Sequence, residues 1–241
     1  MEQKTHELAI LAQQEQVMSH FRDMEKSQVG TYGHGVVYQL TAEATALGIR
    51  LDSFDGVMQA LNARLSRRMN AGREETKKDR TVVVRATEKG LAVTLDAQQS
   101  EQPTFELQEA HLVAALANGV PVSIHATAEE SHLNIYGGMG SSNAPLDTPE
   151  LVLADFENID ALSLGHLPHV KIENTDGLRS MRADTIMSLD IPLSTTEFMH
   201  IGDCQGVTIG EATGGSYYIE DSRVIIGSAG DIDLNVQDGA I

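Results

Sequence analysis

Four short apolar triplets in the last third of the sequence decide the predicted fold. They are Leu151-Val152-Leu153, Val170-Lys171-Ile172, Leu189-Asp190-Ile191 and Val207-Thr208-Ile209, and their last residues lie 19, 19 and 18 positions apart. Ile225-Ile226 follows about 17 positions later. A unit of this length cannot bury its own apolar side chains, but stacked units bury them in a continuous column. The spacing therefore predicts a parallel β-solenoid, or β-helix, of about five 18–19-residue rungs over residues 149–241.

A second series of apolar residues predicts that each rung contains two strands. The series runs through Leu164, Met181, Ile201, Ile219 and Val236, and the intervening turns are rich in Gly, Asp, Asn and Ser. Strands recurring every 8–12 residues or so also fit an antiparallel sandwich or barrel. That alternative stays open from the sequence alone, although the near-constant spacing of the triplets favours the solenoid.

The first third of the chain has the periodicity of helices. An apolar stripe predicts a helix over residues 5–27, interrupted by the glycines of 30–35. A second helix is expected to end at Gly48, and a third to follow a cap at Asp52 or Ser53 and to run over 54–69. Residues 70–80 are polar and charged, as a linker would be. We therefore predict an α+β protein with a helical segment at 1–79, a small mixed α/β cap at 80–148 and the β-solenoid at 149–241.

The predicted cap has the pattern of a hairpin, a helix and two further strands. The hairpin pairs 82–84 with 91–95, the helix covers 109–118, and the strands cover 120–124 and 132–136. Residues 80–148 are expected to cover the first rung of the solenoid. Because exposed sheet edges tend to pair, we expect the last rung to pair with another copy of the chain and form a homodimer.

Charge is distributed unevenly along the 241 residues. The chain carries 35 Asp and Glu against 17 Lys and Arg, for a formal net charge of −18. Residues 50–90 hold ten basic and six acidic residues, whereas 91–241 hold four basic and 23 acidic residues. Such asymmetry is typical of a protein whose parts have separate partners, and ordinary solubility charge is the alternative.

Composition excludes several classes of protein. No apolar run approaches the length of a membrane span, and the N-terminus lacks a signal-peptide pattern. The single Cys204 excludes an intrachain disulfide framework and a multi-cysteine zinc site. Because nucleotide-binding, hydrolase and metalloprotease motifs are also absent, we expect a soluble cytoplasmic protein that is not an enzyme and uses no cofactor.

One group of histidines falls close together in the predicted stack. If Gly165 aligns with Gly202, then His166 lies over Asp203, with His169 and His200 nearby. A metal or acid–base site there is one hypothesis. No supporting ligand spacing is present, so the sequence favours exposed surface histidines.

The carboxylates of the solenoid form the predicted interaction face. The residues are Asp155, Glu157, Asp176, Asp190, Glu197, Asp203, Glu211, Glu220 and Asp221. The leading hypothesis is a non-enzymatic protein that binds a protein partner through this acidic solenoid or its cap. An alternative is a DNA mimic that inhibits a nucleic-acid enzyme, of the kind used in phage counter-defence, because stacked acids resemble a phosphate backbone.

Residues 44–69 carry a loose helix-turn-helix pattern, which supports a second alternative, a DNA-binding regulator. The predicted nucleic-acid contacts on its second helix are Gln59, Asn62, Arg64, Arg67 and Arg68. Glu43 stands where the motif is usually apolar, and Asp52 and Asp55 would face phosphates. A plain helical packing unit is therefore the competing interpretation.

Overall fold

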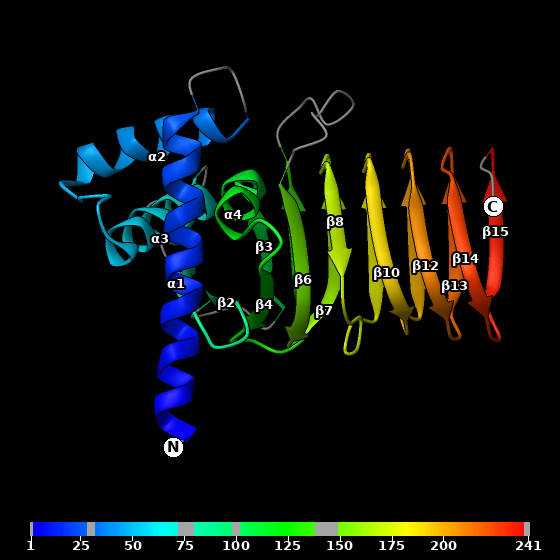
Figure 1. Ribbon diagram of the computed structural model, residues 1–241. Helices are drawn as coiled ribbons and strands as arrows, with labels where there is room; N and C mark the ends of the chain where they lie inside the picture. The colour runs from blue at the N-terminus through cyan, green and yellow to red at the C-terminus, as the bar shows by residue number, and fades with distance from the viewer. Residues whose placement is uncertain (1, 28–31, 72–79, 98–101, 138–148, 239–241) are drawn as a thin grey trace.

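The computed structural model describes residues 2–27, 32–71, 80–97, 102–137 and 149–238. Three helices, α1 (Glu2–Lys26), α2 (Tyr32–Leu47) and α3 (Phe54–Asn70), gather at one end of an elongated molecule (Figure 1). Two sheets extend from this helical end to the C-terminal strand. The fold is therefore α+β, with the helices preceding the β-structure, as the sequence predicts.

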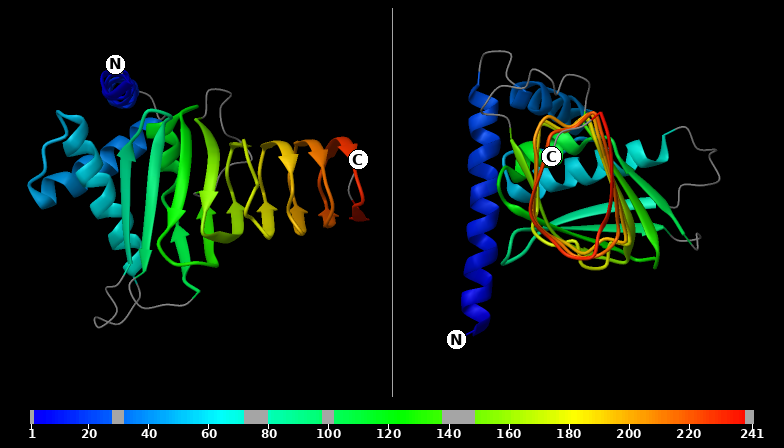
Figure 2. Two further views of the ribbon diagram at one scale, coloured as in Figure 1. Left: turned by 90° about the horizontal axis from the view of Figure 1, so that it is seen from below. Right: turned by 90° about the vertical axis from the view of Figure 1, so that its right-hand side faces the viewer.

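The β-structure consists of two sheets that alternate along the chain. Sheet A contains β1 (Arg80–Ala86), β2 (Leu91–Ala97), β4 (Pro121–Ala126), β6 (Glu150–Glu157), β8 (His169–Ile172), β10 (Ser188–Ser194), β12 (Val207–Ala212) and β14 (Val224–Ala229), in that order. Sheet B contains β3 (Thr104–Leu107), β5 (Ser131–Tyr136), β7 (Ile159–Gly165), β9 (Ser180–Asp184), β11 (Phe198–Gly202), β13 (Ser216–Glu220) and β15 (Asp233–Gln237). Every neighbouring pair is parallel except β1 and β2. The chain thus forms a flattened parallel β-solenoid, whose coils overlie one another along its axis (Figure 2).

The observed register confirms the stacking of the four triplets. Val152 pairs with Lys171, Lys171 with Asp190, and Asp190 with Thr208. In sheet B the second apolar series needs one correction, because Leu164 pairs with Ala183 and not with Met181. Met181 belongs to the adjacent inward column, between Leu162 and Met199.

The parallel ladder begins earlier than the repeat in the sequence indicates. The strand pairs β2–β3 and β4–β5 form two further coils within residues 91–136. Leu91 pairs with Val122 and Val122 with Leu153, each 31 positions apart. The first interval holds helix α4 (Ala110–Ala117), and the second holds residues 138–148, which lie outside the described residues. These longer intervals conceal the 18–19-residue period.

One corner of the solenoid repeats a left-handed backbone conformation. The residues that follow successive strands of sheet B there are His166, Thr185, Asp203, Asp221 and Asp238, with φ between 45° and 55°. The N–H of each of the first four donates to a carbonyl of the next coil, as Asp203 N does to Glu220 O. Asp adopts this conformation more readily than most residues, which explains its recurrence at this corner.

The helices largely follow their sequence signals. The hydroxyl of Ser53 caps α3 by accepting from the N–H of Gly56, and α2 ends before Gly48, which has a φ of +67°. α2 begins at Tyr32, within the glycine-rich stretch expected to be non-helical. The predicted linker falls mostly on 72–79, outside the described residues, and so does the boundary predicted near residue 148.

Candidate functional site

Helix α3 closes the N-terminal edge of sheet A. The outer edge of β1 presents unpaired backbone groups, and three side chains of α3 bind them. Asn70 Nδ2 donates to Arg80 O, Ser66 Oγ accepts from Val82 N, and Asn62 Oδ1 accepts from Val84 N, at 2.8–3.0 Å. Four residues of helix rise by about 6 Å and two residues of strand by about 6.7 Å. A polar residue at every fourth helical position therefore matches every second residue of the strand.

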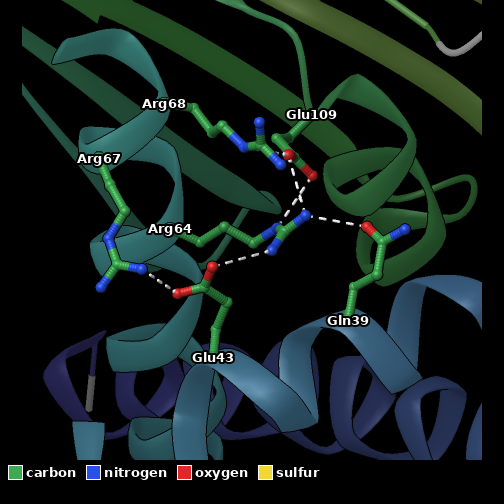
Figure 3. Close-up of polar contacts among 6 residues, drawn as sticks. All are labelled: Gln39, Glu43, Arg64, Arg67, Arg68 and Glu109. Carbon is green, nitrogen blue, oxygen red and sulfur yellow. Dashed lines mark hydrogen bonds and ion pairs between the residues drawn. The ribbon is translucent and has the colours of Figure 1, made fainter. Parts of the chain in front are cut away.

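Arg64 fastens the helical segment to the first coils of the solenoid. Its side chain is only 5% exposed, and its Nε and Nη2 atoms donate to the two carboxylate oxygens of Glu109, both at 3.0 Å. Nη2 also donates to Gln39 Oε1 at 2.8 Å, and Nη1 lies 3.4 Å from Glu43 Oε1 (Figure 3). The cluster thus joins α2 and α3 to Glu109, the residue that precedes α4.

The other two arginines complete this network. Arg67 Nη1 lies 2.6 Å from Glu43 Oε2, and Arg68 Nε lies 3.1 Å from Glu109 Oε1 (Figure 3). Their side chains are 56% and 51% exposed, respectively. Three guanidinium groups thus share two carboxylates, which leaves the cluster with a net charge of +1.

The residues predicted to contact nucleic acid fall into two groups, those with structural partners inside the protein and those that are exposed. Arg64 is buried in the cluster, and Asn62 caps β1, so both already have structural partners. Gln59 is exposed and lines a groove of about 550 Å³ together with Phe54 and Arg85. Nucleic-acid contact stays a prediction for Gln59, Arg67 and Arg68, whereas the burial of Arg64 and the strand cap made by Asn62 count against direct contact by these two.

The C-terminal end of the solenoid has no equivalent cover among the described residues. β14 pairs only with β12, and β15 only with β13. Leu234 and Val236 face along the interior column at this end, yet they are 39% and 38% exposed. Ile225, on the outer face of β14, is 60% exposed. The two ends therefore differ, since α3 covers one and the other presents two open strand edges.

The two sheets differ in how many of their acidic residues form ion pairs. On the sheet B side, Asp160 pairs with Arg179, Asp184 with Arg182, and Glu220 lies 3.7 Å from His200 Nε2. On sheet A, Glu157 contacts His125, and Lys171 contacts Glu173. Five further acids on the strands of sheet A have no cation within ion-pair distance in the described part of the chain: Asp96, Glu150, Asp155, Asp190 and Glu211.

The predicted acidic face is therefore not one surface. Its members lie on the outer side of sheet A (Asp155, Glu157, Asp190, Glu211), on sheet B (Glu220) and at the turns (Asp176, Glu197, Asp203, Asp221). The turn acids Asp203 and Asp221 belong to the left-handed corner. Among the described residues, the strands of sheet A carry more carboxylates without an ion pair than those of sheet B, where Glu106 and Asp233 lack one.

The histidines do not form the hypothesised site. His166 and Asp203 occupy the same corner two coils apart, with Thr185 between them, and His200 lies on β11 beside Tyr218. Two coils correspond to about 9.6 Å, so His166 and Asp203 are not the stacked neighbours that the hypothesis requires. The described residues contain no group of three or more side chains suited to a metal ion.

Burial sets the protonation of two other groups. It lowers the pKa of His111 to about 4, so this imidazole is neutral near pH 7. It raises the pKa of the Cys204 thiol to about 11, and the thiol is 3.2 Å from Gly202 O. A protonated buried thiol is a poor nucleophile, consistent with a packing role for Cys204.

Comparison of the chain with protein-family models, curated proteins and solved structures finds no match. In the described part of the chain, no helix has both the length and the apolar character needed to span a bilayer.

Proposed function

We propose that this protein is a non-enzymatic binding protein, and that the outer face of sheet A binds a basic surface on a protein partner. The observation that carries the proposal is the contrast between the sheets. On sheet B, Asp160, Asp184 and Glu220 contact Arg179, Arg182 and His200, respectively, although Glu106 and Asp233 form no ion pair in the described part of the chain. On sheet A, Asp155, Asp190 and Glu211 form no ion pair among the described residues, although Lys171 is the cross-strand neighbour of Asp190. Sheet A thus offers negative charge to a partner.

Rigid placement of these carboxylates favours recognition. Asp190 and Glu211 stand on neighbouring strands β10 and β12, whose parallel ladder fixes their separation. Unpaired charges on a fixed surface raise the local potential and accelerate association with a partner of opposite charge. A rigid scaffold also loses little conformational freedom on binding. The sheet A strands β8, β10, β12 and β14 lie farther from the helices than β6 does (Figure 1).

A second candidate, the DNA mimic, is supported by charge density. Residues 150–238 contain 16 acids and four basic residues, a net charge of −12 over five coils. At about 4.8 Å per coil, this is about one charge per 2 Å, comparable with about one per 1.7 Å in duplex DNA. The charge per unit length therefore favours the DNA mimic. The acids are nevertheless spread over both sheets and two corners, and this distribution favours binding through sheet A alone.

The test is capture from an extract of the source cells with variants that move charge selectively. Asp155→Asn, Asp190→Asn and Glu211→Gln together neutralise sheet A, and Glu197→Gln, Asp203→Asn and Asp221→Asn neutralise the turns. Both triple variants change the net charge equally. We expect the sheet A variant to lose a stoichiometric protein that the wild-type protein and the turn variant retain.

Nuclease treatment of half of each extract separates the candidates. A protein partner that persists after nuclease supports the proposal, and a nucleic-acid enzyme that free duplex displaces supports the mimic. Equal retention by both triple variants would contradict a sheet A surface. Recovery of nucleic acid itself, with loss of all partners after nuclease, would restore the DNA-binding hypothesis.

A further inference from the structure

We infer that the C-terminal coil, formed by β14 and β15, binds the same coil of a second copy of this chain, end to end. The inference rests on the difference between the two ends. At the N-terminal end, Asn62, Ser66 and Asn70 satisfy the outer edge of β1, and the Arg80 side chain donates to Thr104 O at the edge of β3. At the other end, the edges of β14 and β15 have no partner among the described residues.

The open edge of β15 presents backbone groups suited to strand pairing. Asp233 N donates to Gly215 O, and Gln237 O accepts from Asp221 N, so Asp233 and Gln237 bond toward β13. Because alternate residues of a strand bond to opposite sides, the N–H and C=O groups of Leu234 and Val236 point to the open edge. Their side chains meanwhile occupy the end of the apolar column, more than a third exposed. A partner must therefore supply both hydrogen bonds and apolar contact.

A second copy supplies both, because of the geometry of the coil. β14 and β15 lie in opposite sheets at the same end and run in opposite directions, as consecutive strands of one flattened coil (Figure 2). A single two-fold axis normal to the sheets brings β14 against β14 and β15 against β15 of the second copy, both antiparallel. It also stacks the two exposed apolar ends on each other. One extended peptide would pair with only one of the two edges.

The closed N-terminal end limits this assembly to a dimer. Head-to-tail contacts between unlike ends extend into filaments, whereas a two-fold contact between like ends closes. Since α3 covers the β1 edge, a second solenoid end cannot pair there. The inference therefore specifies a dimer and excludes a fibre.

Charge gives this contact a distinctive salt dependence. Residues 221–238 hold Asp221, Asp231, Asp233 and Asp238 against Arg223, a net charge of −3 at each meeting end. Salt screens repulsion between like charges and leaves the apolar contact in place. Dimerisation should therefore strengthen as salt rises, whereas binding of a basic partner to sheet A should weaken. The opposite salt dependences therefore allow dimerisation and partner binding to be tested separately.

The experiment is sedimentation velocity on the full chain over a range of concentrations, at low and high salt. We expect twice the 26.0 kDa monomer mass at tens of micromolar, with the dimer fraction increasing with salt. Leu234→Lys with Val236→Lys places charge at the contact and should give a monomer. The matched control, Phe198→Lys, changes an exposed residue on β11, two strands from the open edge, and should remain dimeric.

Hydrogen exchange on the wild-type protein tests the contact without relying on a variant. The amides of Leu234 and Val236 should gain protection as concentration rises, while those of β11 should not change. A wild-type monomer at all concentrations and salts, a dimer that survives both lysines, or higher polymers would each overturn the inference. Far-UV circular dichroism confirms that a monomeric double variant is still folded, and if it is not, the exchange result decides.

Discussion

Arg64 is buried between two half-buried carboxylates, Glu43 of α2 and Glu109, and its replacement tests whether that junction is structural. Arg64→Met keeps most of the side-chain volume but leaves Glu109 with Arg68 alone and Glu43 with Arg67 alone. Removing one partner from a buried ion pair is strongly destabilising, and the remaining arginines reduce the loss to about 2–3 kcal/mol. Urea unfolding measures this change in the free energy of unfolding.

Arg67→Met is the matched control on the same turn of α3. Arg67 is 56% exposed and contacts only Glu43 among the described residues, so its loss should be below about 1 kcal/mol. Equal losses for the two variants would show that Arg64 contributes no more than a surface ion pair. A pronounced loss of nucleic-acid binding by Arg64→Met with unchanged stability would instead support the predicted contact between Arg64 and nucleic acid.

His111 predicts a pH dependence of stability. Burial lowers its pKa from 6.5 to about 4 in the folded protein, so the unfolded chain binds more protons between these values. The free energy of unfolding should therefore fall as pH drops from about 6.5 toward 4, by at most about 1.4 kcal/mol per pH unit. Partial exposure of the ring reduces the effect.

The measurement compares urea unfolding of the wild-type protein and His111→Gln between neutral pH and about pH 5. The variant should lose less stability on acidification. Burial also lowers the pKa of His20, against the opposing effect of Asp23, so a residual dependence of the same sign is expected. Parallel pH profiles for the two proteins would contradict the assignment to His111.

At the level of elements, the seal between α3 and β1 depends on side chains that bind a strand edge. Asn62→Ala leaves the N–H of Val84 without its acceptor, which should cost about 1–3 kcal/mol. It should also accelerate hydrogen exchange at Val84 specifically. Gln59→Ala, an exposed position one turn earlier, should change neither. Equal exchange at Val84 in both variants would show that Asn62 does not protect this edge.

Sequence periodicity predicts the regular part of the solenoid because each coil there has a nearly constant length. Val152, Lys171, Asp190 and Thr208 stand in one observed column, and the predicted triplets align as expected. The two earlier coils escape prediction because α4 and residues 138–148 lengthen their intervals to 31 positions. Asp203, Asp221 and Asp238 recur at nearly the same interval and all occupy the left-handed corner. Their spacing is a second sequence signal for the repeat, which the apolar pattern does not include.

The candidate site is less predictable from sequence, since it depends on pairing across distant segments. Arg64 and Glu109 are separated by 45 positions, and nothing in the local pattern of α3 distinguishes an internal ion pair from a phosphate contact. Likewise, the contrast between paired acids on sheet B and unpaired acids on sheet A requires the register. Asp160 and Arg179, for example, meet only because successive coils stack.

At the level of the whole molecule, the described residues form a solenoid with one covered end, one uncovered end and an acidic sheet between them. Helix α3 covers the N-terminal edge of sheet A, sheet A carries unpaired carboxylates, and β14 and β15 have no further strand beside them among the described residues (Figure 1). An end-to-end dimer would place two sheet A surfaces in one rod. Binding to a basic partner that has more than one site would then gain from avidity.

The proposal that sheet A is the binding surface is tested most directly by measuring the affinity of the captured partner for the protein as a function of salt concentration. For the wild-type protein and the turn variant, we expect binding that weakens steeply with salt, with similar slopes. For the sheet A variant, we expect weaker binding and a clearly shallower slope, because charges at the contact have been removed. Identical affinities and slopes for the two triple variants would contradict the claim that sheet A is the binding surface.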